Sequence, residues 1–345
     1  MSEDVNFERI VSGNPVDEND SELDLTLRPK NFDDFTGQDQ IKHNLDVYIR
    51  AARSRGEPLD HILFSGPPGL GKTTLAHIVA AEMEAEIKST SGPVLEKARD
   101  LAGVLSNLNK GDVLFIDEIH RMTPVVEEYL YSAMEDFSID LLIDQGPNAR
   151  SIKINLPPFT LVGATTREGL LTSPLRARFG VLERLEYYPA ADLEKIVTRA
   201  SGLLEVEIET DAAQEIGSRS RGTPRVANRF VRRIRDVAQV EGSGRIDMDA
   251  AVRGLEMLGV DKTGLEKMDR KILKILVQQR GNPVGLKTLA VSIGEEEDTI
   301  EDVYEPFLIQ EGFLLKTARG RIPGDKAYNL FGMAGQEQAS LGLNM

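Results

Sequence analysis

The sequence predicts an α/β domain with a parallel sheet flanked by helices, then an all-α domain, then a small winged-helix domain. From Leu25 to about Tyr187, short apolar runs alternate with helical stretches, which is the pattern of an α/β sheet. From about Pro189 to Gly264 the pattern is helical alone. From Lys267, three helical stretches (269–279, 286–293 and 297–310) precede a predicted hairpin at 313–330, which is the order of a winged helix.

Three apolar runs are the candidate strands of the parallel sheet, and each ends in a polar or small residue: His61–Ser65, Asp112–Asp117 and Thr160–Thr165. Such runs suit buried parallel strands, whose carboxyl ends form the ligand crevice of open α/β folds. In the helical segment, the clearest helix runs from Thr223 to Val240. A threonine that can cap and a proline in the first turn open it.

Composition excludes several classes of protein. The 345 residues favour two or three domains, and the absence of cysteine excludes disulfides, thiolate zinc sites and cysteine nucleophiles. No apolar run is long enough to cross a bilayer and the N-terminus has no signal-peptide core, so we expect a cytoplasmic protein without a membrane partner. The formal charge of −15 requires any nucleic-acid contact to come from a local basic patch, although an acidic proteome would give the same charge without functional meaning.

A glycine-rich loop, Gly66-Pro-Pro-Gly-Leu-Gly-Lys-Thr-Thr74, follows the first strand and precedes a helical run. Its glycines let backbone N–H groups turn inward around phosphate oxygens, and the helix points its positive end at the same anion. A lysine here places a cation on the β- and γ-phosphates, and the next hydroxyl can ligate Mg²⁺. The nucleotide contacts expected from this P-loop are Gly69, Gly71, Lys72, Thr73 and Thr74.

Two adjacent carboxylates, Asp117 and Glu118, end the second candidate strand. Asp117 is expected to orient the Mg²⁺ shell together with Thr73, and Glu118 to position and polarise the attacking water. Acids after a strand are common in turns, but acids that follow a P-loop indicate ATP hydrolysis rather than binding alone. The expected cofactors are therefore ATP or ADP and Mg²⁺.

Taken with their surroundings, these motifs resemble the AAA+ superfamily of ATPases. Leu27-Arg28-Pro29 is similar to the family's N-terminal segment that lies against adenine, and the resemblance also implies that Tyr188 stacks near adenine. Thr166 stands in a sequence similar to sensor 1. A box from Thr172 to Phe179 resembles the one that holds the arginine finger. The set of expected nucleotide contacts also includes Glu135, Asp136 and Phe137.

The resemblance assigns roles to three arginines. Arg178 is the expected finger that reaches into a neighbouring subunit, with Arg176 as the second choice. Arg225, in a sequence similar to sensor 2, is expected to contact the γ-phosphate within its own subunit. Guanidinium groups suit these roles because phosphoryl transfer spreads charge over the γ-oxygens. Without this context, a lone arginine is most simply a solvated surface charge.

Within AAA+, the chain resembles the RuvB family of Holliday junction branch-migration ATPases. The resemblance implies a homo-hexamer on duplex DNA that moves Holliday junctions in recombination and repair, with RuvA as a partner and RuvC as a further candidate. An inserted hairpin at 139–156 corresponds to the family's contact with RuvA. Pattern alone leaves open that this hairpin is buried against its own domain.

The C-terminal segment is similar to the family's winged helix, and its hairpin forms a basic wing. We expect Lys316, Arg319 and Arg321 to contact the DNA backbone, because the preceding helix is acidic and cannot sit easily in a groove. A solvated hairpin is the plainer alternative. Two other functions stay open: another AAA+ machine such as a clamp loader subunit, or a nucleotide-gated winged-helix regulator.

These patterns divide the chain into five segments. They are an acidic tail expected to be disordered (1–24), the ATPase domain (25–188, with the hairpin insertion at 138–156), a helical lid (189–264), the winged helix (265–335) and a C-terminal tail (336–345).

Overall fold

The computed structural model describes residues 26–142 and 151–333. The predicted tails at 1–24 and 336–345, and the predicted turn at 145–148, lie outside the described residues. The chain divides into two compact units, one ending at Tyr188 and the other beginning at Pro189. Neither described part contains a helix long and apolar enough to cross a membrane.

A five-stranded parallel sheet forms the centre of the first unit, in the order β2-β3-β6-β1-β7. Its strands are β1 (Ile62–Ser65), β2 (Ile87–Ser91), β3 (Val113–Asp117), β6 (Thr160–Thr165) and β7 (Val181–Arg184). The three predicted strands are confirmed to within one residue. Because β6 lies between β1 and β3, the ends of these three strands meet at one edge.

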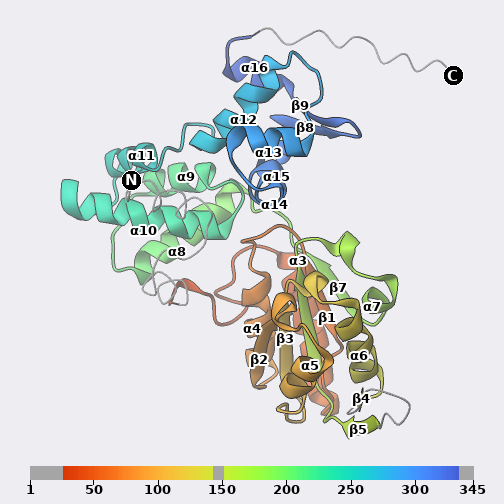
Figure 1. Cartoon of the computed structure of the whole chain (residues 1–345). Helices are drawn as coiled ribbons and strands as arrows, with labels where there is room; N and C mark the ends of the chain where they lie inside the picture. Colours follow the sequence, from red (N-terminus) through yellow and green to blue (C-terminus); the bar gives the residue numbers. More distant parts are fainter. Residues whose placement is uncertain (1–25, 143–150, 334–345) are drawn as a thin grey trace, which may run out of the picture. The chain divides into compact units, whose positions relative to one another are not determined.

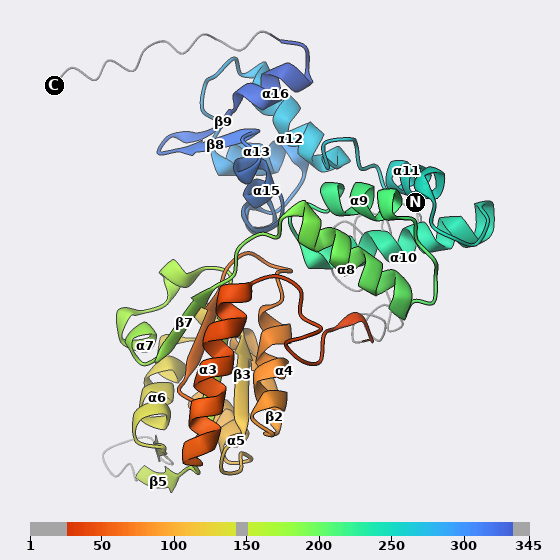
Figure 2. The ribbon, with the colours of Figure 1, turned by 180° about the vertical axis from the view of Figure 1, so that it is seen from behind.

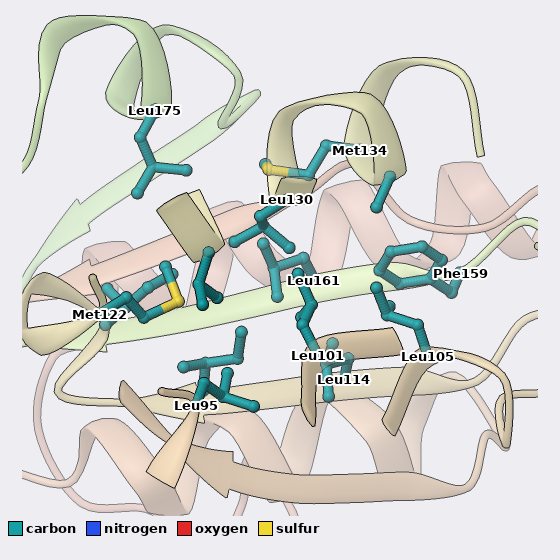
Figure 3. Close-up of a cluster of buried hydrophobic side chains, with 14 of the residues drawn as sticks. Leu95, Leu101, Leu105, Leu114, Met122, Leu130, Met134, Phe159, Leu161 and Leu175 are labelled. Atoms are coloured by element: carbon teal, nitrogen blue, oxygen red, sulfur yellow. The ribbon is translucent and has the colours of Figure 1, made fainter. Parts of the chain in front are cut away.

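Helices cover both faces of the sheet. Figure 1 shows α5 (Ala98–Leu105) and α6 (Pro124–Glu135) over one face, and Figure 2 shows α3 (Asp39–Arg55) and α4 (Lys72–Glu82) over the other. Between the sheet and α5 and α6, leucine, methionine and phenylalanine side chains form a continuous buried cluster, drawn in Figure 3. Burial of this apolar surface is the main contribution to the stability of the unit.

The inserted hairpin forms as predicted, from β4 (Ser138–Leu142) and β5 (Ser151–Asn155), which pair antiparallel. Ile139 is buried against the domain core, whereas Ile152 is 51% exposed. The hairpin is therefore buried at one end and exposed to solvent at Ile152. The base of the hairpin packs on the first unit and its outer part presents an apolar side chain to solvent.

The second unit begins with four helices: α8 (Ala190–Leu203), α9 (Thr210–Arg219), α10 (Pro224–Glu241) and α11 (Met248–Met257). The predicted helix at 223–240 is α10, which begins one residue later because Thr223 is its N-cap. The buried side chains of α10, including Phe230 and Ile234, recur at helical spacing and face the neighbouring helices.

The C-terminal part of this unit has the predicted winged-helix order. Its elements are α12 (Lys267–Gln278), α13 (Leu286–Ile293), α14 (Glu297–Thr299), a π-helical turn (Ile300–Tyr304), α15 (Glu305–Gln310), β8 (Leu314–Thr317), β9 (Gly320–Pro323) and α16 (Asp325–Leu330).

Two details of this domain differ from the expectation. The predicted hairpin at 313–330 ends at Pro323, because a short helix, α16, occupies 325–330. The predicted single helix at 297–310 is interrupted by the π-helical turn. Pro306 explains the interruption, since proline has no N–H and its ring crowds the carbonyl one turn earlier, which a wider turn relieves.

A buried arginine links the helical and winged-helix parts of the second unit. The Arg221 side chain donates from Nε to the Gly264 carbonyl at 3.0 Å, pairs with the Asp269 carboxylate, and lies over the Phe307 ring. Arg221 itself has a positive φ of 56°. Its neighbour Arg229 pairs with Glu266 at 2.7 Å. Arg221 and Arg229 therefore stabilise the packing of the helical part on the winged-helix part of this unit.

Candidate nucleotide site and nucleic-acid interface

The P-loop lies between β1 and α4, as its sequence predicts. Gly66 has a φ of 131°, and a Cβ there would lie 2.6 Å from the Leu185 carbonyl oxygen, so the close backbone approach requires glycine. Lys72 is the first residue of α4, and its Nζ donates to the carbonyls of Gly66 and Pro67 at 2.7 and 2.8 Å. Thr73 and Thr74 follow in the first turn of α4 and are half-buried.

At the end of β3, Asp117 accepts the Glu118 backbone N–H at 3.0 Å, and Glu118 has a φ of 45°. This left-handed conformation is strained for a residue with a side chain, and such strain collects at functional sites. Glu118 Oε2 in turn accepts from Thr166, 3.1 Å from Oγ1 and 3.3 Å from the backbone nitrogen. The structure thus brings together the predicted base and the predicted sensor threonine.

His120 belongs to the same cluster, although no motif in the sequence predicts a role for it. Its Nδ1 lies 3.2 Å from Glu118 Oε2 and 2.9 Å from Thr165 Oγ1, and its side chain is buried. The spacing of the histidines does not predict the contact of His120 with Glu118, because that spacing is informative only for metal sites. The position of His120 two residues after Glu118, in the short η2 turn (Ile119–Arg121), was the available signal.

Two of the expected adenine-side residues, Arg28 and Tyr188, lie close to the P-loop or its helix. Leu27 is buried, and Arg28 lies close enough to His77 of α4 that it adds to the lowering of the His77 pKa, which burial dominates. The Tyr188 hydroxyl donates to the Leu70 carbonyl at 3.1 Å, so this tyrosine packs directly on the phosphate loop. Its expected stacking near adenine stays a prediction.

Arg178 caps α7 (Ser173–Ala177) and points back toward α6. Its Nη2 lies 3.1 Å from Glu135 Oε1, one of the three predicted nucleotide contacts at the end of α6. Asp136 is the C-cap of that helix, and Phe137 has a φ of 46° and stacks edge-on with Phe159. The Phe137 ring thus packs against the core.

The other two predicted arginines, Arg176 and Arg225, are less confined than Arg178. Arg176 is exposed, and its nearest acidic partner is Glu168 at 3.9 Å. Arg225 is exposed in the first turn of α10, in the second unit. Its predicted contact with the γ-phosphate stays a prediction.

The predicted wing is present, but its cations differ in their surroundings. Arg319 is exposed at the tip, and the Lys316 ammonium lies 2.7 Å from Glu301. Arg321 is buried, and it pairs with Glu305 at 2.5 Å and with Glu301 at 2.8 Å. Arg321 is therefore not an exposed cation of the wing, and its predicted contact with DNA stays a prediction. The acidic helix before the wing neutralises part of the wing, and contact of Arg321 with DNA requires an exchange of partners.

Comparison with known proteins agrees with this architecture. Three family models match in succession: the Holliday junction DNA helicase RuvB P-loop domain (27–185), the RuvB AAA lid domain (188–261) and the RuvB C-terminal winged helix domain (262–332). The chain belongs to the RuvB family.

Relatives and solved structures of the RuvB family cover nearly the whole chain. The Holliday junction branch migration complex subunit RuvB of Flavobacterium johnsoniae is 60% identical over 317 residues, 91% of this chain and 93% of the relative. The same subunit of Salinibacter ruber is 60% identical over 317 residues, 92% of each. The Thermotoga maritima RuvB Holliday junction branch migration motor has a TM-score of 0.82 at 52% identity, covering 89% of this chain and 99% of that chain.

Family membership decides between the alternatives left open by the sequence. The AAA lid and winged-helix domains match RuvB models specifically, so the chain is a nucleotide-binding P-loop protein of this family. Neither a clamp loader subunit nor a winged-helix regulator is favoured.

Proposed function

We propose that this chain hydrolyses ATP to drive branch migration of Holliday junctions. The observation that carries the proposal is the meeting of Lys72, Glu118 and Thr166 at the ends of three neighbouring strands, β1, β3 and β6. A phosphate-binding cation and an oriented carboxylate at one edge are what hydrolysis of a nucleoside triphosphate requires. The family match supports the junction as the substrate on which the motor acts.

Each residue of the site has a distinct role in the proposed reaction. Lys72 exchanges its loop carbonyl partners for β- and γ-phosphate oxygens. Glu118, held by Thr166, orients the attacking water and accepts its proton. Thr73 and Asp117 would hold Mg²⁺, and their hydroxyl and carboxylate oxygens fit this hard cation, which takes its remaining ligands from phosphates and water. When bound, Mg²⁺ neutralises charge on the β- and γ-oxygens.

The proposed motor works as a homo-hexamer with ATP bound between subunits. Arg178 of one subunit would stabilise the transition state on the nucleotide of its neighbour, so that hydrolysis depends on assembly. Leu27, Arg28 and Tyr188 would contact the adenine side within the subunit, and Glu135 to Phe137 would complete the neighbour's side. Arg225 would report the state of the γ-phosphate to the lid.

Contacts with DNA and protein partners belong to the same proposal. The wing would hold the DNA backbone without regard to sequence, through Arg319 and Lys316 first and Arg321 after partner exchange. RuvA would dock on the outer part of the 139–156 hairpin, where Ile152 is exposed. RuvC would join the assembled complex, and the complex would act in the cytoplasm.

Two variants at the site test the proposed chemistry. Lys72→Ala should lose both binding of a fluorescent ATP analogue and hydrolysis, whereas Glu118→Gln should bind the analogue and fail to turn over ATP. Lys110→Ala removes an exposed lysine from the same unit and serves as the control. Hydrolysis at the wild-type rate in Glu118→Gln would contradict the assignment of the base.

A further inference from the structure

Arg178 is held on three sides within its own subunit. Nη1 donates to the Pro174 carbonyl at 2.8 Å, Nη2 lies 3.1 Å from Glu135 Oε1, and the guanidinium lies over the Tyr131 ring, 4.4 Å from its centroid. Only 22% of the Arg178 side chain is exposed. An unrestrained arginine on a surface samples many rotamers, so this degree of confinement needs an explanation.

Tyr131 is itself fixed by its hydroxyl. The hydroxyl donates to Glu127 Oε1 at 2.5 Å and lies 2.9 Å from Thr172 Oγ1. Thr172 also donates to Glu127, and it is the N-cap of α7, where it accepts from the Leu175 N–H. The ring therefore connects the body of α6 to the start of the helix that carries Arg178.

The partners of Arg178 differ in how easily they can be exchanged. Glu135 is 56% exposed on the surface, so a phosphate oxygen can replace its carboxylate without burial of a new charge. Tyr131 is partly buried and packs on the hydrophobic cluster behind α6, so its ring stays in place when Glu135 is displaced. A guanidinium stacked on an aromatic face keeps its N–H edge available for an anion.

We propose that Tyr131 is a positioning residue for ATP hydrolysis, which stacks on Arg178 and aims it at the nucleotide of the neighbouring subunit. The inference rests on the proposed function, in which Arg178 acts on that neighbouring nucleotide. A guanidinium that is already oriented does not lose rotamer freedom when it stabilises the transition state. Its orientation therefore raises kcat rather than nucleotide affinity.

Two substitutions separate the contribution of the aromatic face of Tyr131 from that of its hydroxyl. Tyr131→Leu keeps an apolar side chain but removes both the aromatic face and the hydroxyl, and we expect kcat to fall about 3- to 30-fold with KM nearly unchanged. Tyr131→Phe keeps the face and loses only the hydroxyl, so it should recover most of the lost kcat. Equal impairment in the two variants, or a wild-type kcat in Tyr131→Leu, would overturn the inference.

Mixed assemblies test whether Tyr131 acts through the finger. Glu118→Gln subunits bind ATP without turnover and still supply Arg178, whereas Arg178→Ala subunits turn over only when a neighbour supplies the finger. Mixing the two should restore ATP hydrolysis. Tyr131→Leu added to the Glu118→Gln subunit should reduce the restored rate, and the same change in the Arg178→Ala subunit should leave it unchanged.

The outcomes distinguish this inference from the function on which it rests. Failure of the mixture to restore hydrolysis, or a wild-type rate in Arg178→Ala alone, contradicts the finger assigned under the proposed function. Restoration that is insensitive to Tyr131→Leu, or equally sensitive in either subunit, keeps the finger and overturns the role of Tyr131.

Discussion

The Thr166 hydroxyl donates to Glu118 Oε2 at 3.1 Å, and the Thr166 backbone nitrogen lies 3.3 Å from the same oxygen. One residue at the end of β6 thus holds, through two contacts, the carboxylate that follows β3. Because β3 and β6 are hydrogen-bonded neighbours, the sheet itself sets the direction in which Glu118 points. This pairing connects the fold of the first unit to the proposed chemistry.

Removal of the Thr166 hydroxyl should therefore slow hydrolysis without loss of nucleotide. Thr166→Val keeps the side-chain shape and deletes one hydrogen bond to a charged group, which contributes about 1.5–3 kcal/mol. We expect kcat to fall about 10- to 100-fold and ATP-analogue binding to stay within a factor of about two. Thr166→Ser, which keeps the hydroxyl, is the matched control. Equal rates in the Val and Ser variants would show that the contact plays no part in turnover.

Glu301 should compete with DNA for the cations of the wing, if the wing binds DNA as proposed. It accepts from Lys316 at 2.7 Å and from Arg321 at 2.8 Å, and these partners lower the pKa of its carboxyl. Glu301→Gln removes the carboxylate that pairs with Lys316 and Arg321, so these cations should become available to DNA phosphates. We expect duplex binding, measured by fluorescence anisotropy, to tighten about two- to fivefold. The slope of log affinity against log salt should steepen by about one unit.

The control for this experiment is Glu297→Gln, which removes the same charge from an exposed position on the acidic segment. We expect its DNA affinity and its salt dependence to stay near those of the wild type. An equal gain in the two variants would mean that net charge alone sets the affinity.

Asp269 should make the stability of the second unit depend on pH. Burial raises the pKa of this carboxyl from 3.8 to about 6, opposed by Arg221, and its Oδ1 is buried without a hydrogen-bond partner. Between pH 3.8 and about pH 6 the folded state keeps the Asp269 proton, whereas the unfolded state has lost it. The stability that this bound proton contributes therefore falls as the pH rises, and is lost above the folded pKa of about 6. Relative to Asp269→Asn, the wild type should gain on the order of 1 kcal/mol between pH 7 and pH 5.

Urea unfolding of both proteins at pH 5, 6 and 7 measures that difference directly. Groups other than Asp269 cancel in the comparison, because they are common to both chains. A difference in the free energy of unfolding that stays constant over this range would show that Asp269 titrates as an ordinary carboxyl.

The hairpin should couple the motor to its protein partner through Ile152. The side chain is exposed on β5, whereas its cross-strand neighbours toward the base pack on the domain. Ile152→Asp should leave basal ATP hydrolysis unchanged and abolish its stimulation by RuvA, because a charge would enter an apolar contact. Lys153→Asp changes the adjacent exposed residue and should have a smaller effect. Stimulation that survives Ile152→Asp would place the RuvA contact elsewhere.

Local patterns predicted where the P-loop and the strand-end acids lie in the fold. The P-loop and the acids after β3 depend on residues that are adjacent in sequence, and backbone geometry determines where they point. The β2 strand was not predicted because Ile-Lys-Ser-Thr-Ser has little apolar character, and its position at the sheet edge tolerates that composition. The π-helical turn follows from a single proline, Pro306, whose effect depends on the helix around it.

Long-range pairings account for what sequence could not predict. Glu118 and His120 are close in sequence, but the Thr165 and Thr166 hydroxyls that complete their cluster come from another strand. Burial of Arg321 depends on Glu305, a partner 16 residues earlier. A basic wing and an acidic helix were both recognised from composition, but only the packed structure shows that their charges neutralise each other.

The most direct test of the proposed branch migration is strand dissociation of a synthetic four-way junction, with RuvA and ATP, beside a linear duplex control. We expect the wild-type chain to dissociate the junction in an ATP-dependent manner that RuvA enhances, and Glu118→Gln to fail to dissociate it. ATP turnover by the wild-type chain without any movement of the junction would contradict the proposed function.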